Sequence, residues 1–153
     1  MSKIRKFEVV ENWARKNEGV EIKLPKRATK FSTGYDFFVP TDTILIPNKP
    51  TFIHTDVKAH IPDDEFLSIY IRSSLAVKKE IVLINGVGIV DADYSRNNNK
   101  NDGNIMICLM NTNKKYITLN QGERVAQGIF QKYYIVEDDE VEKIRNGGVG
   151  STG

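Results

Sequence analysis

The most informative stretch of the chain reads 85-NGVGIVDADY-94, an apolar run of β type that contains two glycines and ends in two carboxylates and a ring. Gly86 and Gly88 let another group approach the backbone closely, because glycine has no Cβ. A strand backbone can hydrogen-bond a flat ligand, the ring of Tyr94 can cover that ligand, and a carboxylate at the end of the strand can handle a proton. The stretch therefore predicts a ligand site built on a strand.

Length and composition limit the class of protein. A chain of 153 residues is most simply one domain over 1–153, and 40% hydrophobic residues suit a packed core. A net charge of +2 with 27% charged residues is too balanced to indicate a nucleic-acid or membrane partner. There is no apolar run of 18 residues and no signal-peptide pattern. Cys108 is the only cysteine, which favours a reducing, cytoplasmic setting.

The segments around residues 85–94 are mostly of β type. They are rich in Ile, Val, Phe and Tyr and are separated by Pro, Gly, Asn and Asp. Short strands with turn signals between them predict an all-β sandwich, jelly roll or barrel. The expected strands are 20–24, 43–46, 51–60, 65–71, 81–90, 104–110, 115–119 and 124–135.

Few segments outside these strands show a helical pattern. Residues 73–79 predict one short helix with a serine cap, and residues 138–144 predict a further helical turn. Residues 7–16 are interpreted as a strand that runs into a polar loop. The tail, 145-RNGGVGSTG-153, is rich in glycine and is expected to have no fixed fold of its own.

Two further segments combine residue types that suit anions or metals. The segment 32-STGYDF-37 is either a turn into a buried strand or a site that puts Asp36 near a metal or a sugar. In 70-YIRSSLA-76 a strand runs into a guanidinium, two hydroxyls and the start of a helix. Those groups favour a phosphate, and the alternative is a serine N-cap beside a surface arginine.

Two more segments complete the candidate site. In 122-GERVAQGIF-130 a turn enters a core strand, and Gln127 is a polar residue among apolar ones. The tail could wrap polyphosphate with its backbone N–H groups and hydroxyls, or it could be a frayed terminus.

Taken together and in this order, the segments resemble the five motifs of the trimeric dUTPase family. The motifs read 32-STGYD-36, 72-RSSLA-76, 88-GIVDADY-94, 122-GERVAQ-127 and 147-GGVGSTG-153. The segment 24-LPKRAT-29 is similar to the family's lead-in to its first motif, so the resemblance runs from Leu24 to Gly153.

The resemblance implies a jelly-roll-like β fold, a homotrimer, and Mg²⁺-dependent hydrolysis of dUTP to dUMP and pyrophosphate. This reaction keeps uracil out of DNA and supplies dUMP for thymidylate synthesis. In the family each active site is shared by three subunits. The second and fourth motifs come from one chain, the third motif from another, and the tail of the third chain closes over the site.

The resemblance also implies roles for single residues. Asp91 would orient and activate the attacking water, and Tyr94 would pack under the deoxyribose, where a 2′-hydroxyl would collide with it. Asp36 would lie near the metal, through water. The other expected contacts are Asn85, Ile89, Val90 and Met106 for uracil, Arg72, Ser73, Ser74 and Gln127 for the phosphates, and Arg145, Val149, Gly150, Ser151 and Thr152 from the closing tail.

Three features depart from the common family pattern. Val149 stands where an aromatic residue usually stacks on uracil, and valine cannot stack. Arg145 lies only four residues before Val149, a tighter spacing than in many relatives. Residues 95–102 lengthen a hairpin tip, and we expect this insertion at the surface with no direct catalytic role.

Three alternatives remain open at this point. The related dCTP deaminase family shares the Arg-Ser-Ser-Leu segment, but the strand that carries its catalytic glutamate has Cys108 here, which leaves no obvious acid or base. A non-hydrolytic dUTP-binding regulator is suggested by Val149, and Asp91 and Gln127 argue against it. A jelly-roll module without a ligand would leave the five motifs unexplained.

Overall fold

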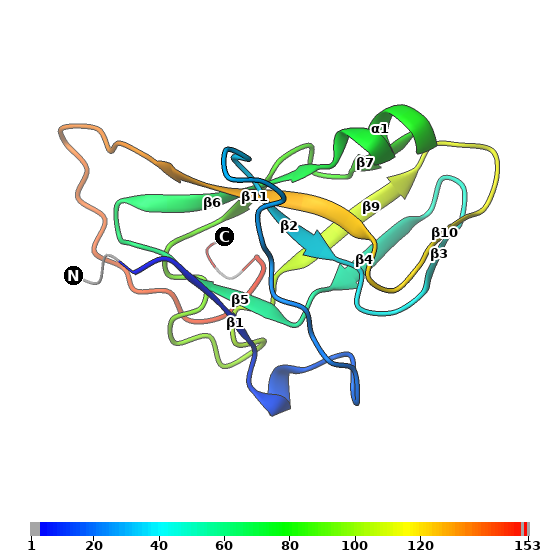
Figure 1. Cartoon of the computed structure of the whole chain (residues 1–153). Helices are drawn as coiled ribbons and strands as arrows, with labels where there is room; N and C mark the ends of the chain where they lie inside the picture. The colour runs from blue at the N-terminus through cyan, green and yellow to red at the C-terminus, as the bar shows by residue number, and fades with distance from the viewer. Residues whose placement is uncertain (1–3, 151, 153) are drawn as a thin grey trace.

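Short β-strands make up most of the ordered chain (Figure 1). The computed structural model describes residues 4–150 and 152. Two helices accompany the strands, η1 (Asn12–Ala14) and α1 (Ser73–Lys79). The strands are β1 (Lys6–Val9), β2 (Tyr35–Phe38), β3 (Thr43–Leu45), β4 (Pro50–His54), β5 (Val57–His60), β6 (Glu65–Ile71), β7 (Ile81–Leu83), β8 (Gly88–Val90), β9 (Met106–Asn111), β10 (Ile117–Leu119) and β11 (Arg124–Lys132).

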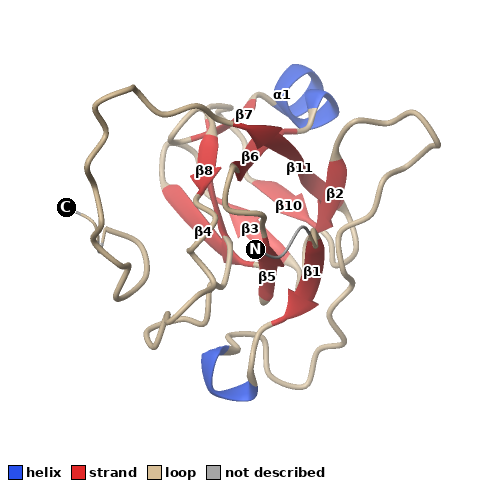
Figure 2. Cartoon of the chain, turned by 90° about the vertical axis from the view of Figure 1, so that its left-hand side faces the viewer, coloured by secondary structure: helices blue, strands red, loops and turns tan. Residues whose placement is uncertain are grey.

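The strands form four sheets around a common interior (Figure 2). The largest has the order β2-β11-β6-β8, the next β4-β9-β7, and the other two are the pairs β1-β5 and β10-β3. All strand pairs within these sheets are antiparallel. The all-β prediction is confirmed, and the described strands stay in separate sheets and do not close into one barrel.

Alternation along the strands explains how one core is shared by all four sheets. In β9, Ile107 and Leu109 are buried while Met106, Cys108 and Met110 are only half-buried, as expected for a strand with one face inward. Buried side chains from each sheet join this core, among them Phe7, Phe37, Leu45, Ile53, Leu67, Leu109, Leu119 and Val125.

Two predicted strands are interrupted by left-handed backbone. The segment 51–60 breaks into β4 and β5 because Asp56 has φ +57°, and the buried Asp56 carboxylate accepts hydrogen bonds from Lys16, Asn17 and Asn104. The segment 81–90 breaks into β7 and β8 at a turn in which Gly86 has φ +69°.

Other elements predicted from the sequence differ from the structure more than these interrupted strands do. Residues 20–24 form no strand, and residues 138–144 form no helix. The helix over 73–79 is confirmed, but its serine cap is wrong: Arg72 occupies the N-cap position, and no side-chain hydrogen bond caps the helix. Both serines therefore lie inside the first turn, where their side chains are exposed.

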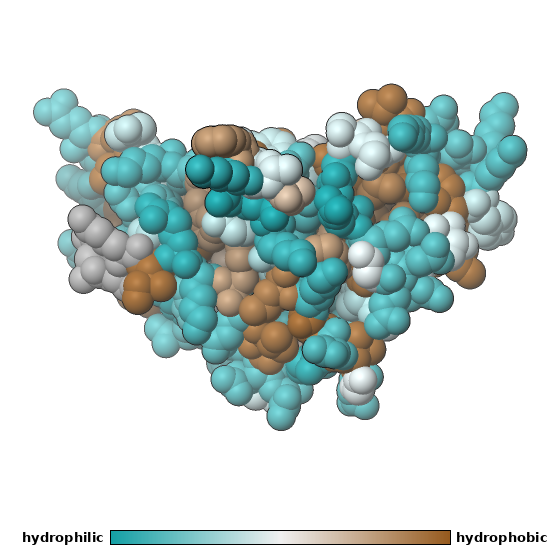
Figure 3. Space-filling view, viewed as in Figure 1, coloured by the Kyte–Doolittle hydropathy of each residue, from teal (hydrophilic) through white to brown (hydrophobic). Residues whose placement is uncertain are grey.

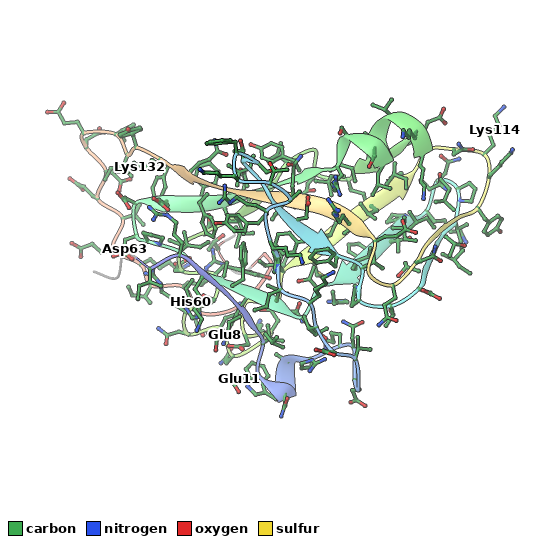
Figure 4. The ribbon with its side chains drawn as sticks, viewed as in Figure 1. Glu8, Glu11, His60, Asp63, Lys114 and Lys132 are labelled. Atoms are coloured by element: carbon green, nitrogen blue, oxygen red, sulfur yellow. The ribbon has the colours of Figure 1, made fainter. Side chains whose placement is uncertain are left out.

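The outer surface is mostly hydrophilic on the face shown in Figure 3, where apolar residues form separate patches. Glu8 and His60 lie side by side on β1 and β5 (Figure 4), with 2.8 Å between Oε2 and Nε2. In the part of the chain that the structure describes, no helix has the length and apolar character needed to cross a membrane.

Candidate active site

The first candidate site is a cavity of about 250 Å³ beside β8. Its floor comes from β8, β9 and the turn before β8, and its cover comes from the tail. In Figure 2 the segment after β11 runs along the side of the molecule that carries β8. We call this the β8 cavity; its lining includes Asn85, Ile89, Val90, Asp91, Tyr94, Met106, Arg145, Val149, Gly150 and Thr152.

Strand β8 is suited to bind a flat polar ligand because it lies at the edge of its sheet. Within the described residues it pairs only with β6, so one edge of its backbone faces away from the sheet. Gly88 packs directly on Ile69: a Cβ at position 88 would lie 3.0 Å from Ile69 Cβ. The strand can therefore sit this close to β6 only with glycine at position 88.

The ring of Tyr94 forms one wall of the β8 cavity and is held at its hydroxyl. Tyr94 donates to the carbonyl of Asn104 at 3.2 Å, and the Asn101 amide donates to Tyr94 Oη at 2.9 Å. Burial raises the pKa of Tyr94, and the hydrogen bond from Asn101 opposes that shift only in part. The hydroxyl therefore stays protonated near neutral pH.

Two carboxylates at the mouth of the cavity share one guanidinium. Arg145 Nη2 lies 2.6 Å from Asp91 Oδ2, and Arg145 Nε lies 2.7 Å from Asp93 Oδ1. The guanidinium carbon is 5.7 Å from the centre of the Tyr94 ring. The Arg145 side chain is only 7% exposed, whereas that of Asp91 is 57% exposed. Asp91 thus keeps an accessible oxygen while the arginine fixes its orientation.

A second cavity, of about 310 Å³, lies where β2 and β11 meet the start of α1. We call it the arginine cavity. Its lining is polar and consists of Ala28, Ser32, Thr33, Gly34, Asp36, Arg72, Ser73 and Gln127. Gly34 is required there, since a Cβ would lie 2.9 Å from Gln127 Cβ and 2.5 Å from its Oε1.

Asp36 organises the charges of the arginine cavity. Its side chain is 9% exposed and lies between two guanidinium groups, 3.6 Å from Arg72 Nε and 3.5 Å from Arg124 Nη1. One buried carboxylate between two arginines leaves a net positive charge, which suits the oxygens of a phosphate chain.

The structure groups the predicted residues into two sets. The β8 cavity gathers the predicted uracil and sugar contacts together with most of the tail of the same chain, where the resemblance implied the tail of another chain. The arginine cavity gathers Arg72, Ser73, Gln127 and Asp36, and the predicted phosphate contact Ser74 lines neither cavity. Among the described residues the two cavities share no lining residue. Arg145 lies with Asp91 and away from the predicted phosphate contacts, and Ser151 lies outside the described residues.

Three residues at these cavities were not predicted from the sequence. Arg124 stood out only as part of a motif, although its spacing from Gln127 puts it at the same end of β11. Asn101 belongs to the expected surface insertion. Gly34 has the pattern of a turn residue, and only the packing of Gln127 shows its role.

The side chains at these cavities supply few ligands for a metal ion. Among the described residues, no group of three His, Cys, Asp or Glu side chains is placed to hold an ion. This arrangement fits a magnesium ion that keeps its waters and arrives on substrate phosphates better than one held in a protein cage.

An edge strand with an aromatic wall, next to a carboxylate pair and a separate cationic cavity, defines a nucleotide-binding β protein. Comparison with known proteins narrows this class. A family model described as dUTPase matches residues 20–153. The chain therefore belongs to the dUTPase family, as the motifs predicted.

Individual relatives agree with this assignment. The deoxyuridine 5′-triphosphate nucleotidohydrolase of Lactococcus lactis is 40% identical over 153 residues, which cover 99% of both chains. The crystal structure of dUTPase from Streptococcus mutans has a TM-score of 0.75 at 35% identity and covers 86% of this chain and 98% of that one. This likeness confirms the family's jelly-roll-like fold.

A third comparison concerns fold alone. The structure of a mutant dUTPase from phage phi11 of S. aureus has a TM-score of 0.68 at 22% identity, covering 92% of this chain and 97% of that one. That structure is described as revealing the coordination of a structural Mg(II) ion.

Proposed function

We propose that this chain hydrolyses dUTP to dUMP and pyrophosphate. Family membership and the nucleotidohydrolase relatives support the reaction class. The observation that carries the proposal is the position of Asp91, exposed at the mouth of a slot formed by an edge strand and an aromatic ring. The reaction would keep uracil out of DNA and supply dUMP for thymidylate synthesis.

Uracil is the base that suits the edge of β8. Its polar edge alternates acceptor, donor and acceptor, and the backbone of Ile89 and Val90 offers complementary groups at fixed spacing. Asn85 and Met106 line the same slot. The close packing of Gly88 on Ile69 keeps the slot narrow, which disfavours the 5-methyl group of thymine.

Tyr94 selects the sugar in this proposal. The half-buried ring is fixed at its hydroxyl and forms a wall beside the slot. A deoxyribose can pack on that ring, whereas a 2′-hydroxyl would press against it. The selection is therefore steric, and it requires that the ring cannot shift.

Asp91 is the proposed base. A carboxylate oxygen can accept a proton from water. Its ion pair with Arg145 limits its rotation. Asp91 would orient one water toward the phosphate chain, and base assistance of this kind contributes on the order of 10²–10⁴-fold.

The phosphates would lie against Arg72, Ser73, Ser74 and Gln127, with Arg124 as a further contact. Phosphoryl transfer needs positioning and charge stabilisation more than covalent help, and the arginine cavity supplies both. The tail residues Ser151 and Thr152 would close on the phosphates from the other side, with Val149 and Gly150 over the base, while Arg145 stays on Asp91 and Asp93.

Mg²⁺ is the proposed cofactor. The metal would be held by the triphosphate oxygens and by water, with Asp36 as a neighbour through water. When bound, it withdraws charge from the phosphate oxygens. Chelation by EDTA should stop pyrophosphate release, and added Mg²⁺ should restore it.

We further propose a homotrimer with shared active sites. Among the described residues the two cavities share no lining residue, which supports a site completed by the arginine cavity of another copy. The outer face of β4-β9-β7 is apolar: Phe52 is 56% exposed, Val82 42% and Ile84 45%, beside Met106 and Met110. A second copy can cover this face, and sedimentation of the free protein tests the assembly. The free thiol of Cys108 favours a cytoplasmic setting.

A panel of nucleotides tests the function. The protein is incubated with Mg²⁺ and each of dUTP, dCTP, dTTP and UTP, and pyrophosphate and ammonia are assayed. Pyrophosphate from dUTP alone is the expected result. Ammonia from dCTP would instead assign a deaminase, and tight dUTP binding without turnover would assign a regulator.

A further inference from the structure

The Asn-rich segment between Tyr94 and β9, residues 95–104, contains no strand or helix but is held by its own hydrogen bonds. We call it the 95–104 loop. Asn98 is 5% exposed, and its side-chain oxygen accepts from the backbone N–H groups of Lys100 and Asn101 at 3.2 Å each. Its amide donates to the carbonyl of Tyr94 at 2.9 Å. The expectation of a plain surface insertion is wrong at this residue, because Asn98 is a buried organiser of the loop.

The loop is also fastened to the body of the protein. The carboxylate of Asp102 lies 2.8 Å from Lys58 Nζ, and both side chains are largely buried, at 14% and 10% exposure. The same Asp102 oxygen accepts from the backbone N–H of Glu11 at 2.8 Å, at the end of the segment that follows β1 (Figure 4). Ser95 donates to the carbonyl of Ala59 at 2.9 Å. These contacts fix the loop against β1 and β5.

The fixed loop presents Asn101 to the hydroxyl of Tyr94, whose ring lines the β8 cavity. Asn101 donates to Tyr94 Oη at 2.9 Å, while its own side-chain oxygen accepts from the N–H of Gly103 at 3.0 Å. Tyr94 in turn donates to the carbonyl of Asn104. Both the lone pair and the proton of the tyrosine hydroxyl are therefore held by one loop, so the plane and depth of the ring are set by the loop that follows Tyr94.

The same asparagine contacts the tail. Gly147 and Gly148 are buried, and an ideal Cβ at position 148 would lie 3.0 Å from Asn101 Nδ2 and 3.2 Å from its Cγ. These distances are shorter than normal side-chain contacts, so the tail backbone rests directly on Asn101. One side chain thus contacts both the ring that forms the sugar wall and the segment that covers the cavity.

We propose that Asn101 is a positioning and specificity-determining residue that holds the Tyr94 ring in place for sugar selection. The inference rests on the proposed reaction for the identity of the sugar. Without Asn101 the Tyr94 ring would lose one of its two hydrogen bonds and could yield to a 2′-hydroxyl.

The first experiment compares Asn101→Ala with Asn99→Ala, an exposed neighbour in the same loop with no side-chain hydrogen bond among the described residues. We expect Asn101→Ala to lower kcat/KM for dUTP roughly tenfold, the size of effect that one lost hydrogen bond gives, and to narrow the preference for dUTP over UTP. Asn99→Ala should match the wild type in both. An unchanged dUTP preference in Asn101→Ala would overturn the role in specificity.

A second measurement does not depend on turnover. Calorimetric affinities for dUMP and UMP should differ less in Asn101→Ala than in the wild type, and the addition of Tyr94→Phe should make the Asn101 substitution nearly silent. If the wild type releases no pyrophosphate from dUTP, the proposed reaction fails, while the dUMP-to-UMP ratio still decides the role of Asn101. A ratio equal to that of the wild type would overturn it.

Discussion

The β8 cavity and the arginine cavity hold their charges in opposite ways. At the β8 cavity one buried guanidinium, Arg145, lies between Asp91, which lines the cavity, and Asp93 beside it, and both carboxylates are more exposed than the arginine. At the arginine cavity one buried carboxylate, Asp36, lies between Arg72, which lines the cavity, and Arg124 beside it, and both guanidinium groups are partly exposed. Each cavity therefore buries the charge that organises it and exposes the opposite charge toward a ligand.

This inversion suggests a division of labour. Exposed carboxylates suit proton transfer and repel phosphate, whereas exposed guanidinium groups attract it. The base and sugar side is shaped by backbone and ring packing, and the phosphate side by charge. Substitutions in the two cavities should therefore produce different kinetic and salt effects.

The largest effect is expected from Asp91→Asn. The amide keeps the size of the side chain but cannot accept a proton from water, so kcat should fall on the order of 10²–10⁴-fold. KM for dUTP should change little. Pyrophosphate release at saturating dUTP measures the loss.

Asp93→Asn is the matched control, because it neutralises a second carboxylate partner of Arg145 without removing the proposed base. Asp93→Asn should lower kcat far less than Asp91→Asn. Equal losses in the two variants would assign the effect to the shared ion pair and remove Asp91 from its role as base.

A smaller effect is expected from Gly88→Ala, which tests the β8 cavity, where packing sets the shape of the site. The added Cβ would lie 3.0 Å from Ile69 Cβ, so β8 must move and the slot must change shape. We expect kcat/KM for dUTP to fall roughly 10–100-fold, since small displacements in a positioning site have effects of this order. Val87→Ala, beside it and exposed, is the control.

Gly34→Ala provides the counterpart in the arginine cavity, where the methyl group would push Gln127. Deoxyuridine carries no phosphate, so its binding should weaken in Gly88→Ala and stay unchanged in Gly34→Ala. Loss of deoxyuridine binding in Gly34→Ala would contradict the division between the two cavities.

Arg124→Ala tests the charged side and should have a milder effect. The side chain is 47% exposed, and Arg72 remains on Asp36 when Arg124 is removed. KM for dUTP should rise about threefold to tenfold at low salt, and the rise should shrink as salt screens the remaining charge. Arg124→Lys keeps the positive charge, so its rise in KM should be smaller than that of Arg124→Ala. A KM that is unchanged at low salt would exclude Arg124 from phosphate binding.

The sequence predicted more of the chemistry than of the geometry. The five motifs were sufficient for the family, and periodicity located helix α1 and most strands. It failed where left-handed residues broke long apolar runs, at Asp56 and Gly86, because alternation continues through such breaks. It also failed for residues 20–24, which have a β-type composition but pair with no strand in the described chain.

The candidate site shows the same limit. Asp91 and Tyr94 were predicted because a carboxylate and an aromatic ring next to a glycine-containing strand are residue types typical of a ligand site, and because they match a family motif. The role of Asn101 depends on a loop whose order comes from side-chain hydrogen bonds of Asn98 and Asp102, and these bonds have no sequence period. Arg124 gained its importance only when Asp36 was found beside it.

The smallest expected effect concerns the cover of the β8 cavity. Val149 lines this cavity but is 71% exposed, so it buries little area over the slot. In Val149→Phe a ring can stack on uracil, and stacking of this kind contributes about 0.5–1.5 kcal/mol, or roughly two- to tenfold in affinity. Calorimetry with dUMP measures the gain, and Val149→Leu adds apolar area without a ring. If leucine gives the same gain as phenylalanine, the tail contributes by area alone and stacking plays no part.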